Sequence, residues 1–551
     1  MKQNFPNLQA PATQLADLVL QNGNIFTVDA RRPRVQAVAI RGETIAAVGS
    51  DAEMKPWIGP ETRVIDLHGA FAMPGFNDAH VHLLSAGLAK LEIDLQGAKS
   101  LAEFQQRVRG ALKDYKPGEW ITGRGWDHTL WPEKKFPTRQ DLDAVAADRP
   151  MFFGRVDGHV AIVNSLALKI SGITKDTPDP PAGHIVRDPA TGEPTGMLEE
   201  DSAQSLVLRH IPSPGPARLR RAIEIALADA AEHGVTSLQD NSISGENSWG
   251  VFVLYQQLQS EGKLTARITE WLPFEAPLEK LEEMRKRGGT SDAWLKTGAL
   301  KGFLDGSLGS RTAALLAPYS DDPSTSGILR MDPYETQLQA IERDAAGFQI
   351  NFHAIGDRAN HVALDVFEAV RSANGIRDRR DRIEHAQILA SADIPRFVEL
   401  DVIASVQPSH LLDDERWVDA RIGADRVAGA YAWNTLEKSG AHLAFGTDFP
   451  VEPINPMLNL YACVTRELPE GGPTGGWQPQ EKISIEDAIR NYTEGSAYAQ
   501  FEEQRKGRIA VGQFADIVVL SADVTRVPPR DILRTKAELT IVGGRVVFES
   551  K

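Results

Sequence analysis

The segment MPGFNDAHVHL (residues 73–83) places two histidines, His80 and His82, one residue apart near the end of a strand-like run. In a β-strand, residues i and i+2 point to the same face, so the two imidazoles would lie side by side, about 6.6 Å apart along the strand. Val81 would point the other way, into an apolar layer. An isolated pair of this kind arises easily by chance, so the rest of the chain decides whether it binds a cation.

The middle of the chain alternates strand-like runs with segments of helix length. Seven further strands are expected at residues 234–240, 265–272, 296–304, 348–356, 382–386, 402–408 and 442–448. Eight β/α units predict an α/β fold of the (β/α)8 TIM-barrel type, whose active site lies at the C-terminal ends of the strands. An open doubly wound sheet is the competing fold, but the sequence lacks its GxGxxG turn after a first strand.

Both ends of the chain contain short alternating strands with tight turns, which predicts one small β-sandwich domain built from both termini. A segment far longer than an ordinary βα loop follows the first barrel strand and predicts an inserted subdomain. The expected boundaries are residues 1–72 and 500–551 for the β-sandwich, 73–90 for barrel strand 1, 91–215 for an α/β subdomain over the active site and 216–499 for the rest of the barrel.

The composition narrows the classes of partner. The net charge of −15 comes without a basic stripe, which argues against nucleic acid. The single cysteine, Cys463, excludes an internal disulfide and a cysteine-based metal cluster. No apolar run approaches the roughly 20 residues of a membrane span, and the start of the chain has no apolar signal-peptide core. We expect a cytoplasmic protein, although a chain whose signal peptide had been removed would look the same.

Polar residues recur where the predicted barrel strands end. Lys301 lies in the fourth strand, His353 closes the fifth, His385 closes the sixth and Asp448 ends the eighth. Because these ends meet at the mouth of a barrel, we expect the four side chains to gather around the first histidine pair. Imidazole and carboxylate ligands suit Zn²⁺, and also Mn²⁺, Fe²⁺ or Co²⁺.

Seven local sequences match one known family. They are PGFNDAHVHL (74–83), DGHVAIVNS (157–165), LKGFLDGSLGSRTAAL (300–315), NFHAIGD (351–357), RIEHAQ (382–387), QPSHL (407–411) and GTDFPVEP (446–453). On these motifs the chain resembles the amidohydrolase superfamily and, within it, the amidohydrolase-3 branch. The resemblance covers almost the whole chain and implies the same arrangement of barrel, terminal β-sandwich and insertion.

The resemblance implies a centre of two divalent metal ions, with zinc as the expected ion. The implied ligands are His80 and His82 on the first ion, His353 and His385 on the second, a carbon dioxide-derived carbamate on Lys301 as the bridge, and Asp448 on the first ion. Asp448 would also be the catalytic residue that accepts a proton from the attacking water. Asp305 competes with Lys301, because it shares that strand face two pleats further on and could supply an oxygen instead.

We predict a hydrolase acting on a small molecule with an amide-type C–N bond other than a peptide bond. An N-formyl or N-acyl amine, a cyclic amide, an ester or a carbamate would suit such a centre, with a metal-bridging hydroxide as the attacking species. One alternative is a mononuclear-metal deaminase of a nucleobase-like ring, which would not need Lys301. Another is a catalytically silent barrel with a binding or regulatory role. The resemblance also suggests a homodimer.

Four residues are candidates for contact with the substrate. His410 follows the seventh strand and would face the mouth, and His159 would reach it from the insertion. Arg311 would clamp a substrate carboxylate or carbonyl, or would instead form a structural ion pair. Trp126 belongs to a cluster with Trp120 and Trp131, which either packs the core of the insertion or forms an aromatic wall over the pocket.

Overall fold

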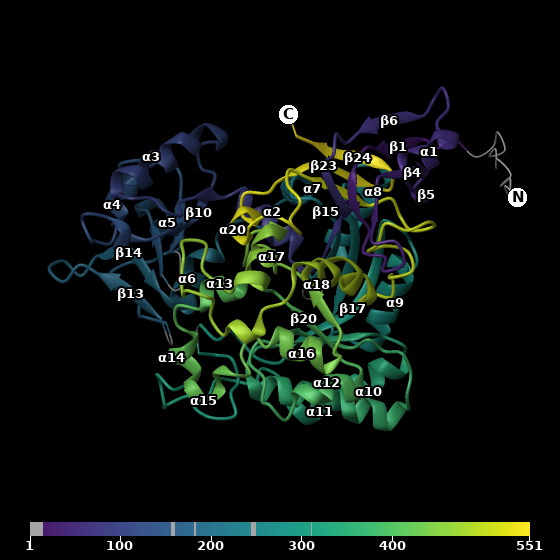
Figure 1. The fold of residues 1–551 in the computed structure, drawn as a ribbon. Coiled ribbons are helices and arrows are strands. Elements are labelled where there is room, and N and C mark those ends of the chain that lie inside the picture. Colours follow the sequence, from purple (N-terminus) through teal and green to yellow (C-terminus); the bar gives the residue numbers. More distant parts are fainter. Residues whose placement is uncertain (1–14, 156–159, 181–182, 244–248, 310, 551) are drawn as a thin grey trace, which may run out of the picture. The chain divides into compact units, whose positions relative to one another are not determined.

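Eight parallel strands in the middle of the chain form one sheet, and they pair in chain order (Figure 1). The strands are β8 (Phe76–Val81), β15 (Val235–Asp240), β16 (Arg267–Pro273), β17 (Leu295–Phe303), β18 (Ile350–Ala354), β19 (Arg382–His385), β20 (Ile403–Val406) and β21 (Leu443–Phe445). The computed structural model describes residues 15–155, 160–180, 183–243, 249–309 and 311–550. All eight strands predicted from the sequence are present.

Hydrogen bonds between β8 and the segment after β21 close the sheet into a barrel. The amide of Asp448 donates to the carbonyl of His80, and the amide of His82 donates to the carbonyl of Phe449, both over 2.8 Å. Gly446 permits this approach, because a Cβ at that position would lie 2.6 Å from the amide nitrogen of His80. The predicted TIM barrel is therefore confirmed, and its closure places the two ends of the histidine–aspartate set next to each other.

Helices connect successive barrel strands, as the β/α pattern predicts. They are α8 (Trp249–Ser260), α9 (Leu278–Gly288), α10 (Pro333–Ala345), α11 (Asp357–Asn374), α12 (Ile394–Leu400), α16 (Trp433–Ser439) and α17 (Pro456–Thr465), with short α13 (His410–Asp414), α14 (Val418–Ile422) and α15 (Ala424–Val427) before α16. Helix α10 illustrates the local signals: Asp332 caps it by accepting from two amides of its first turn, and Pro333 occupies the first helical position.

Two further sheets lie outside the barrel, and the second of them contains strands from both ends of the chain. One has the order β5-β4-β1-β6 and the other β24-β23-β22-β7-β2-β3. Their strands are β1 (Leu18–Gln21), β2 (Asn24–Phe26), β3 (Arg34–Val35), β4 (Ala37–Arg41), β5 (Thr44–Gly49), β6 (Arg63–Asp66), β7 (Phe71–Pro74), β22 (Ile517–Leu520), β23 (Ala537–Val542) and β24 (Arg545–Glu549). Leu20, Ile40, Ile517 and Ile541 belong to one buried cluster, so the two sheets share a core as a β-sandwich.

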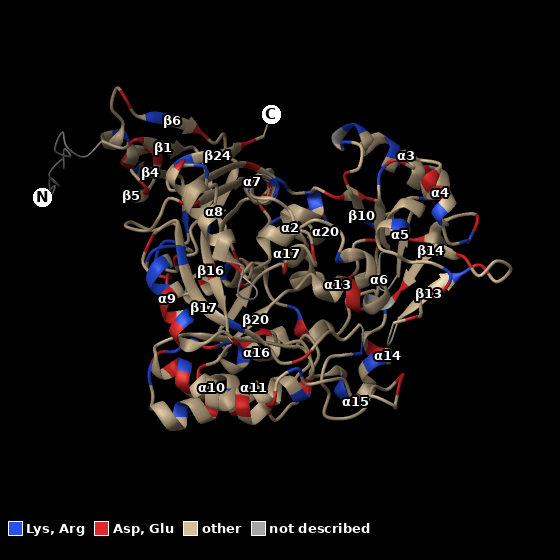
Figure 2. Ribbon diagram, turned by 180° about the vertical axis from the view of Figure 1, so that it is seen from behind, with Lys and Arg blue, Asp and Glu red and all other residues tan. Residues whose placement is uncertain are grey.

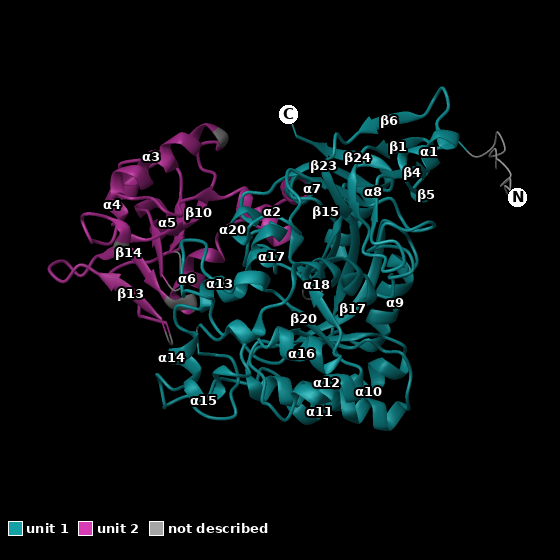
Figure 3. Ribbon diagram, in the orientation of Figure 1, with its two compact units in different colours: residues 1–83, 227–551 teal, residues 84–226 magenta. Residues whose placement is uncertain are grey.

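Contacts divide the chain into two compact units (Figure 3). Unit 1 comprises residues 1–83 and 227–551, and unit 2 comprises residues 84–226. The sheet of unit 2 contains, in spatial order, β13 (His184–Arg187), β14 (Pro194–Glu199), β12 (Val160–Val163), β11 (Met151–Arg155), β10 (Ile121–Trp126) and β9 (Ile93–Asp94). Its helices are α2 (Leu83–Lys90), α3 (Leu101–Ala111), α4 (Arg139–Asp143), α5 (Ser165–Ile170), α6 (Glu200–Leu208) and the start of α7 (Pro216–Glu232).

Charged residues of both signs are interspersed along α10 and α11, on the outside of the barrel sheet (Figure 2). Neither helix therefore carries a run of charge of a single sign. Within the described part of the chain, no helix combines the length and the apolar character that a membrane span requires.

Candidate metal centre

The two histidines of the opening motif lie side by side, with ring centroids 5.4 Å apart. His80 places its Nδ1 2.8 Å from Oε2 of Glu384, and His82 places its Nδ1 3.1 Å from the carbonyl oxygen of Asn241. In a neutral ring, a nitrogen that faces an acceptor carries the proton. The Nε2 atoms of both rings are therefore the ones available to a metal.

The other two predicted histidines face the same space from neighbouring strands. The ring centroids of His353 and His385 are 4.5 Å apart, and those of His80 and His385 are 5.2 Å apart. His385 Nδ1 lies 2.7 Å from Oε1 of Gln407, which leaves its Nε2 as the ligand atom. His353 instead places its Nε2 3.1 Å from the carbonyl oxygen of Gly306, so its Nδ1 is the nitrogen that can bind a metal.

Asp448 joins these histidines into a donor set that fits a cation. Its Oδ1 lies 3.1 Å from His82 Nε2, and its Oδ2 lies 3.7 Å from Nε2 of His410. Because the His82 proton is on the other nitrogen, this contact brings two acceptors together, and Oδ1 forms no hydrogen bond with any described residue. Two groups of potential ligand atoms share this carboxylate: His80, His82 and Asp448, and His385, His410 and Asp448. The donors therefore fit bound metal.

Two of these residues adopt a backbone conformation that is uncommon for side-chain-bearing residues. His385 has a φ of 77° and Asp448 has a φ of 59°, both in the left-handed region. Such conformations cost free energy and persist where the surrounding structure enforces them, often at functional sites. The backbone at the end of β19 and after β21 is thus held in a shape that turns both side chains toward the mouth of the barrel.

Lys301 lies on β17 and is almost completely buried, with 2% exposure. Its Nζ is 3.4 Å from His80 Nε2 and 4.9 Å from the ring centroid of Phe303. Among the described residues it forms no ion pair, so a charged ammonium here would be poorly compensated. Burial lowers the pKa of Lys301 to about 8, although the carboxylates of Glu384 and Asp448 oppose the shift.

Asp305 was the predicted alternative to Lys301 as a metal ligand, but its carboxylate binds backbone amides in the structure. Its Oδ2 accepts from the amides of Ala314 and Gly356, and its Oδ1 accepts from the amide of Ile355, over 2.9–3.0 Å. The carboxylate is fully buried and anchors the backbone around the ends of β17 and β18. This leaves Lys301 as the stronger candidate for the bridging position.

Burial favours the neutral form of His80, His353 and His385, which is the form that metals bind. Burial, assisted by the nearby Lys301, lowers the pKa of His80 to about 4 and that of His353 to about 3, and burial also lowers the pKa of His385 well below its ordinary value. For Asp448, burial alone would raise the pKa, but the surrounding histidines lower it well below its ordinary value. Neutral His80, His353 and His385 beside an ionised Asp448 are the ligand forms that metals require.

A layer of residues behind the ligands was not predicted. Arg382 places its Nε 2.8 Å from Oε1 of Glu384, and Glu384 contacts His80, so a buried chain crosses the barrel interior. Asp78 accepts from the amides of His80 and Thr447 and holds the start of the motif against the eighth strand. The period-2 alternation of a strand, which puts Arg382 and Glu384 on one face of RIEHAQ, was the available signal.

The predicted substrate-contact residues that the structure describes have different surroundings. His410 is near the donor set, and its Nε2 is buried without a hydrogen-bond partner among the described residues. Arg311 forms a double hydrogen bond to Asp321, over 3.1 and 2.9 Å, which is its predicted structural alternative. His159 lies outside the described residues.

The tryptophans belong to unit 2. Trp126 is fully buried and Trp131 nearly so, in one apolar cluster. Trp126 Nε1 donates to the carbonyl of Phe153, and Trp131 Nε1 donates to the carbonyl of Ala98, both over 2.9 Å. Their burial with satisfied N–H groups matches the packing alternative rather than an aromatic wall, so a substrate contact is not assigned to Trp126.

The histidines and the aspartate gather at the C-terminal mouth of a (β/α)8 barrel, where enzymes of this fold have their active sites, and they can bind a metal there. A model of the amidohydrolase family matches residues 63–548 of the chain. The chain therefore belongs to the amidohydrolase family, as its motifs predict, and is a hydrolase of carbon–nitrogen bonds other than peptide bonds.

Several similar proteins match nearly the whole length of the chain. Protein LONG AFTER FAR-RED 3 of Arabidopsis thaliana is 38% identical over 549 residues, covering 98% of this chain and 93% of that protein. N-substituted formamide deformylase of Arthrobacter pascens is 26% identical over 548 residues, covering 98% and 99% respectively. The crystal structure of an uncharacterized metal-dependent hydrolase from Pyrococcus furiosus superposes with a TM-score of 0.76 at 31% identity, covering 92% of this chain and 100% of that one.

Proposed function

We propose that the chain is a binuclear amidohydrolase that cleaves the amide bond of an N-formyl amine, an N-acyl amine or a cyclic amide. The observation that carries this proposal is that the carboxylate of Asp448 belongs to two groups of potential ligands, one with His80 and His82 and one with His385 and His410. The similarity to N-substituted formamide deformylase supports the N-formyl class. The substrate would be a small molecule, and the enzyme would act as a homodimer.

The residues present would hold two divalent ions, with zinc as the expected metal. His80 and His82 would bind the first through Nε2, and His353 and His385 would bind the second through Nδ1 and Nε2 respectively. Zinc prefers imidazole nitrogen and carboxylate oxygen. When bound, such ions lower the pKa of water from about 16 to about 7 and polarise a carbonyl group.

Lys301 would bridge the two positions as a carbamate. Its amine is buried close to His80 and forms no ion pair with a described residue, so conversion to an anion replaces a costly charge with one that suits a cationic centre. The depressed pKa favours the neutral amine, which is the form that adds to carbon dioxide. This requirement for a bridge distinguishes the proposal from a mononuclear deaminase.

Asp448 would act as the proton carrier. Its Oδ1 points to the histidine pair, while its Oδ2 points toward His410. Asp448 would take a proton from the attacking water and deliver it to the nitrogen of the breaking C–N bond, because an amine leaves poorly as an anion. The buried Nε2 of His410 would donate to the carbonyl oxygen as negative charge develops there.

Metal content and hydrolysis, measured on the same preparations, test the proposal. We expect about two equivalents of zinc or a similar ion per chain, as in two-metal hydrolases, with turnover of N-formyl or N-acyl amines. His353→Ala should lose turnover with its melting profile retained, and His442→Ala should keep both, because His442 is exposed just before β21. About one ion per chain with turnover of an aminated ring would favour the mononuclear deaminase, and no ion after incubation with zinc and bicarbonate would reject the centre.

A further inference from the structure

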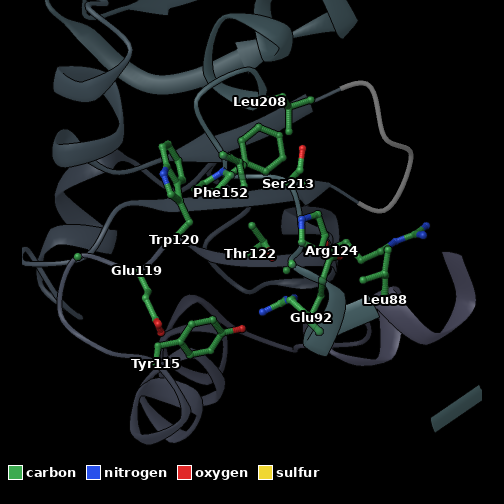
Figure 4. A pocket seen from close by; sticks show the side chains of 18 residues that line it. Leu88, Glu92, Tyr115, Glu119, Trp120, Thr122, Arg124, Phe152, Leu208 and Ser213 are labelled. Atoms are coloured by element: carbon green, nitrogen blue, oxygen red, sulfur yellow. The ribbon is translucent and has the colours of Figure 1, made fainter. Parts of the chain in front are cut away.

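Unit 2 contains a cavity of its own, with a volume of about 730 Å³ (Figure 4). It lies at the start of β10 and over β11, and it is bounded by α2, the end of α6 and the start of α7. All 18 lining residues belong to unit 2. Its volume is in the range of small-molecule pockets, roughly 300–1,000 Å³. The metal centre uses none of these residues.

Aromatic and aliphatic side chains form part of the wall. Trp120 and Phe152 both face the cavity, with Leu208 beside Phe152 (Figure 4). Trp120 was predicted as part of the tryptophan cluster, but it lines this cavity while its two neighbours pack in the core. Such rings offer a large apolar contact area to a ligand at a low entropy cost.

The sheet leaves open space below these rings. Thr122 and Phe152 lie on adjacent strands, and Gly154 follows two residues after Phe152 on the same face. A Cβ added at Gly154 would meet nothing closer than the Cβ of Arg124, at 4.0 Å. A glycine thus forms part of the floor where any other residue would begin to fill the cavity.

Charges of both signs line the cavity. Arg124 and Arg218 form neither an ion pair nor a side-chain hydrogen bond with any described residue. The half-buried Glu92 lies near both guanidinium groups, which oppose the rise in the pKa of its carboxyl caused by burial. The cavity therefore offers a carboxylate, two guanidinium groups without ion-pair partners and an apolar wall within one small volume.

We propose that this cavity binds an α-amino acid with an aromatic or large aliphatic side chain. Its carboxylate would pair with Arg124 or Arg218, its ammonium group would pair with Glu92, and its side chain would contact Trp120 and Phe152. An amino acid is the small ligand class that uses all three kinds of lining group, and guanidinium is well suited to pair with a carboxylate.

Calorimetric titration of the metal-loaded full chain with L-phenylalanine tests this assignment. 3-Phenylpropionate lacks the ammonium group and 2-phenylethylamine lacks the carboxylate, so each should bind at least about tenfold more weakly than phenylalanine. Gly154→Val should abolish binding, because the side chain enters the cavity while valine suits a strand. Arg124→Met should weaken binding by about tenfold or more, whereas the matched Arg109→Met, on an exposed part of α3, should not.

Amino acids also chelate metals, so the experiment must distinguish binding in the cavity of unit 2 from binding at the metal centre. Binding that persists in Asp448→Asn but disappears in Gly154→Val would support the cavity of unit 2. Binding lost in Asp448→Asn and kept in Gly154→Val would assign phenylalanine to the metal centre and overturn the proposal, as would the absence of binding at millimolar phenylalanine. Equal binding of the two truncated ligands would overturn it as well. Circular dichroism of Gly154→Val determines whether a loss of binding comes from unfolding, and in that case Arg124→Met decides the test.

Discussion

Glu384 places its Oε2 2.8 Å from Nδ1 of His80, and both side chains are almost fully buried. Arg382 contacts the other carboxylate oxygen over 2.8 Å and donates to the carbonyl of Ala79. This chain of three side chains fixes the orientation and the tautomer of His80, so that Nε2 faces the donor set. A carboxylate behind a ligand histidine also makes the imidazole a stronger base toward a metal.

Glu384→Gln is expected to weaken metal binding by about 10–100-fold, the usual effect of losing such a carboxylate partner. The variant also leaves Arg382 buried without its counter-ion, which should cost about 3–5 kcal/mol in the free energy of unfolding. Competition with a chelator on the folded variant measures the metal affinity. Glu368→Gln on the exposed face of α11 is the matched control, and equal affinities of the two variants would contradict the role assigned to Glu384.

Asp448→Asn is expected to lower the rate of hydrolysis by at least about 10²-fold, because the amide cannot carry a proton from water to the leaving nitrogen. It should also reduce metal occupancy, since the carboxylate is shared by both groups of potential ligands. Initial rates and elemental analysis of the same sample separate the two effects. If the variant holds as much metal as the native chain and retains its rate, Asp448 is not the proton carrier. Asp365→Asn, which changes an exposed carboxylate, should be unaffected.

Lys301→Met is expected to reduce the metal content from about two ions to about one, because the bridging carboxylate cannot form. Methionine has a similar length and no charge, so the variant should fold at least as stably as the native chain without metal. Metal content is compared before and after removal and return of bicarbonate. The native chain should lose and regain the second ion, and Lys301→Met should respond to neither step. A variant that still binds two ions would exclude the carbamate.

The barrel and the gathering of these side chains at its mouth could be predicted because both depend on local sequence. Each strand is a short apolar run, and His353, His385 and Asp448 stand at strand ends that any parallel barrel brings together. The tautomers could not be predicted in the same way. Glu384 reaches His80 across 304 positions of sequence, and that contact exists only once the barrel has closed.

In the insertion, too, the sequence alone does not determine which contacts a side chain makes. Trp120 and Trp126 are six positions apart in one aromatic cluster, and their types alone do not distinguish a wall from a core. The structure separates them because Trp120 precedes β10 and lines a cavity, whereas Trp126 ends β10 on the packed side of the sheet. Which face of a strand is covered depends on helices that come from elsewhere in the chain.

Trp126→Phe tests the packing role. The substitution leaves the carbonyl of Phe153 without its donor and removes part of a fully buried ring, so the free energy of unfolding should fall by about 1–3 kcal/mol. The KM of any substrate found for the metal centre should not change. Chemical denaturation and steady-state kinetics check the two expectations. A raised KM with unchanged stability would restore the aromatic-wall interpretation.

Asp381 offers a test of buried charge away from the ligands. It is buried, its Oδ1 accepts from the amide of Ile350 over 2.9 Å, and burial raises its pKa from 3.8 to about 7. The folded state therefore holds the proton more tightly than the unfolded state. The protonated carboxyl of Asp381 therefore adds to the free energy of unfolding. This contribution is fully present below about pH 4 and is lost as the pH rises through about 7.

Asp381→Asn keeps the acceptor oxygen and removes the ionisation. Relative to the native chain, we expect the variant to gain stability as the pH rises from 5 to 8, by on the order of 2–4 kcal/mol. Melting temperatures of both proteins at the two pH values measure this gain. Asp425→Asn, which changes an exposed residue of α15 in the same way, is the matched control. If the melting temperatures of Asp381→Asn and the native chain change in parallel, Asp381 is ionised in the folded state throughout this range, and its burial does not limit stability.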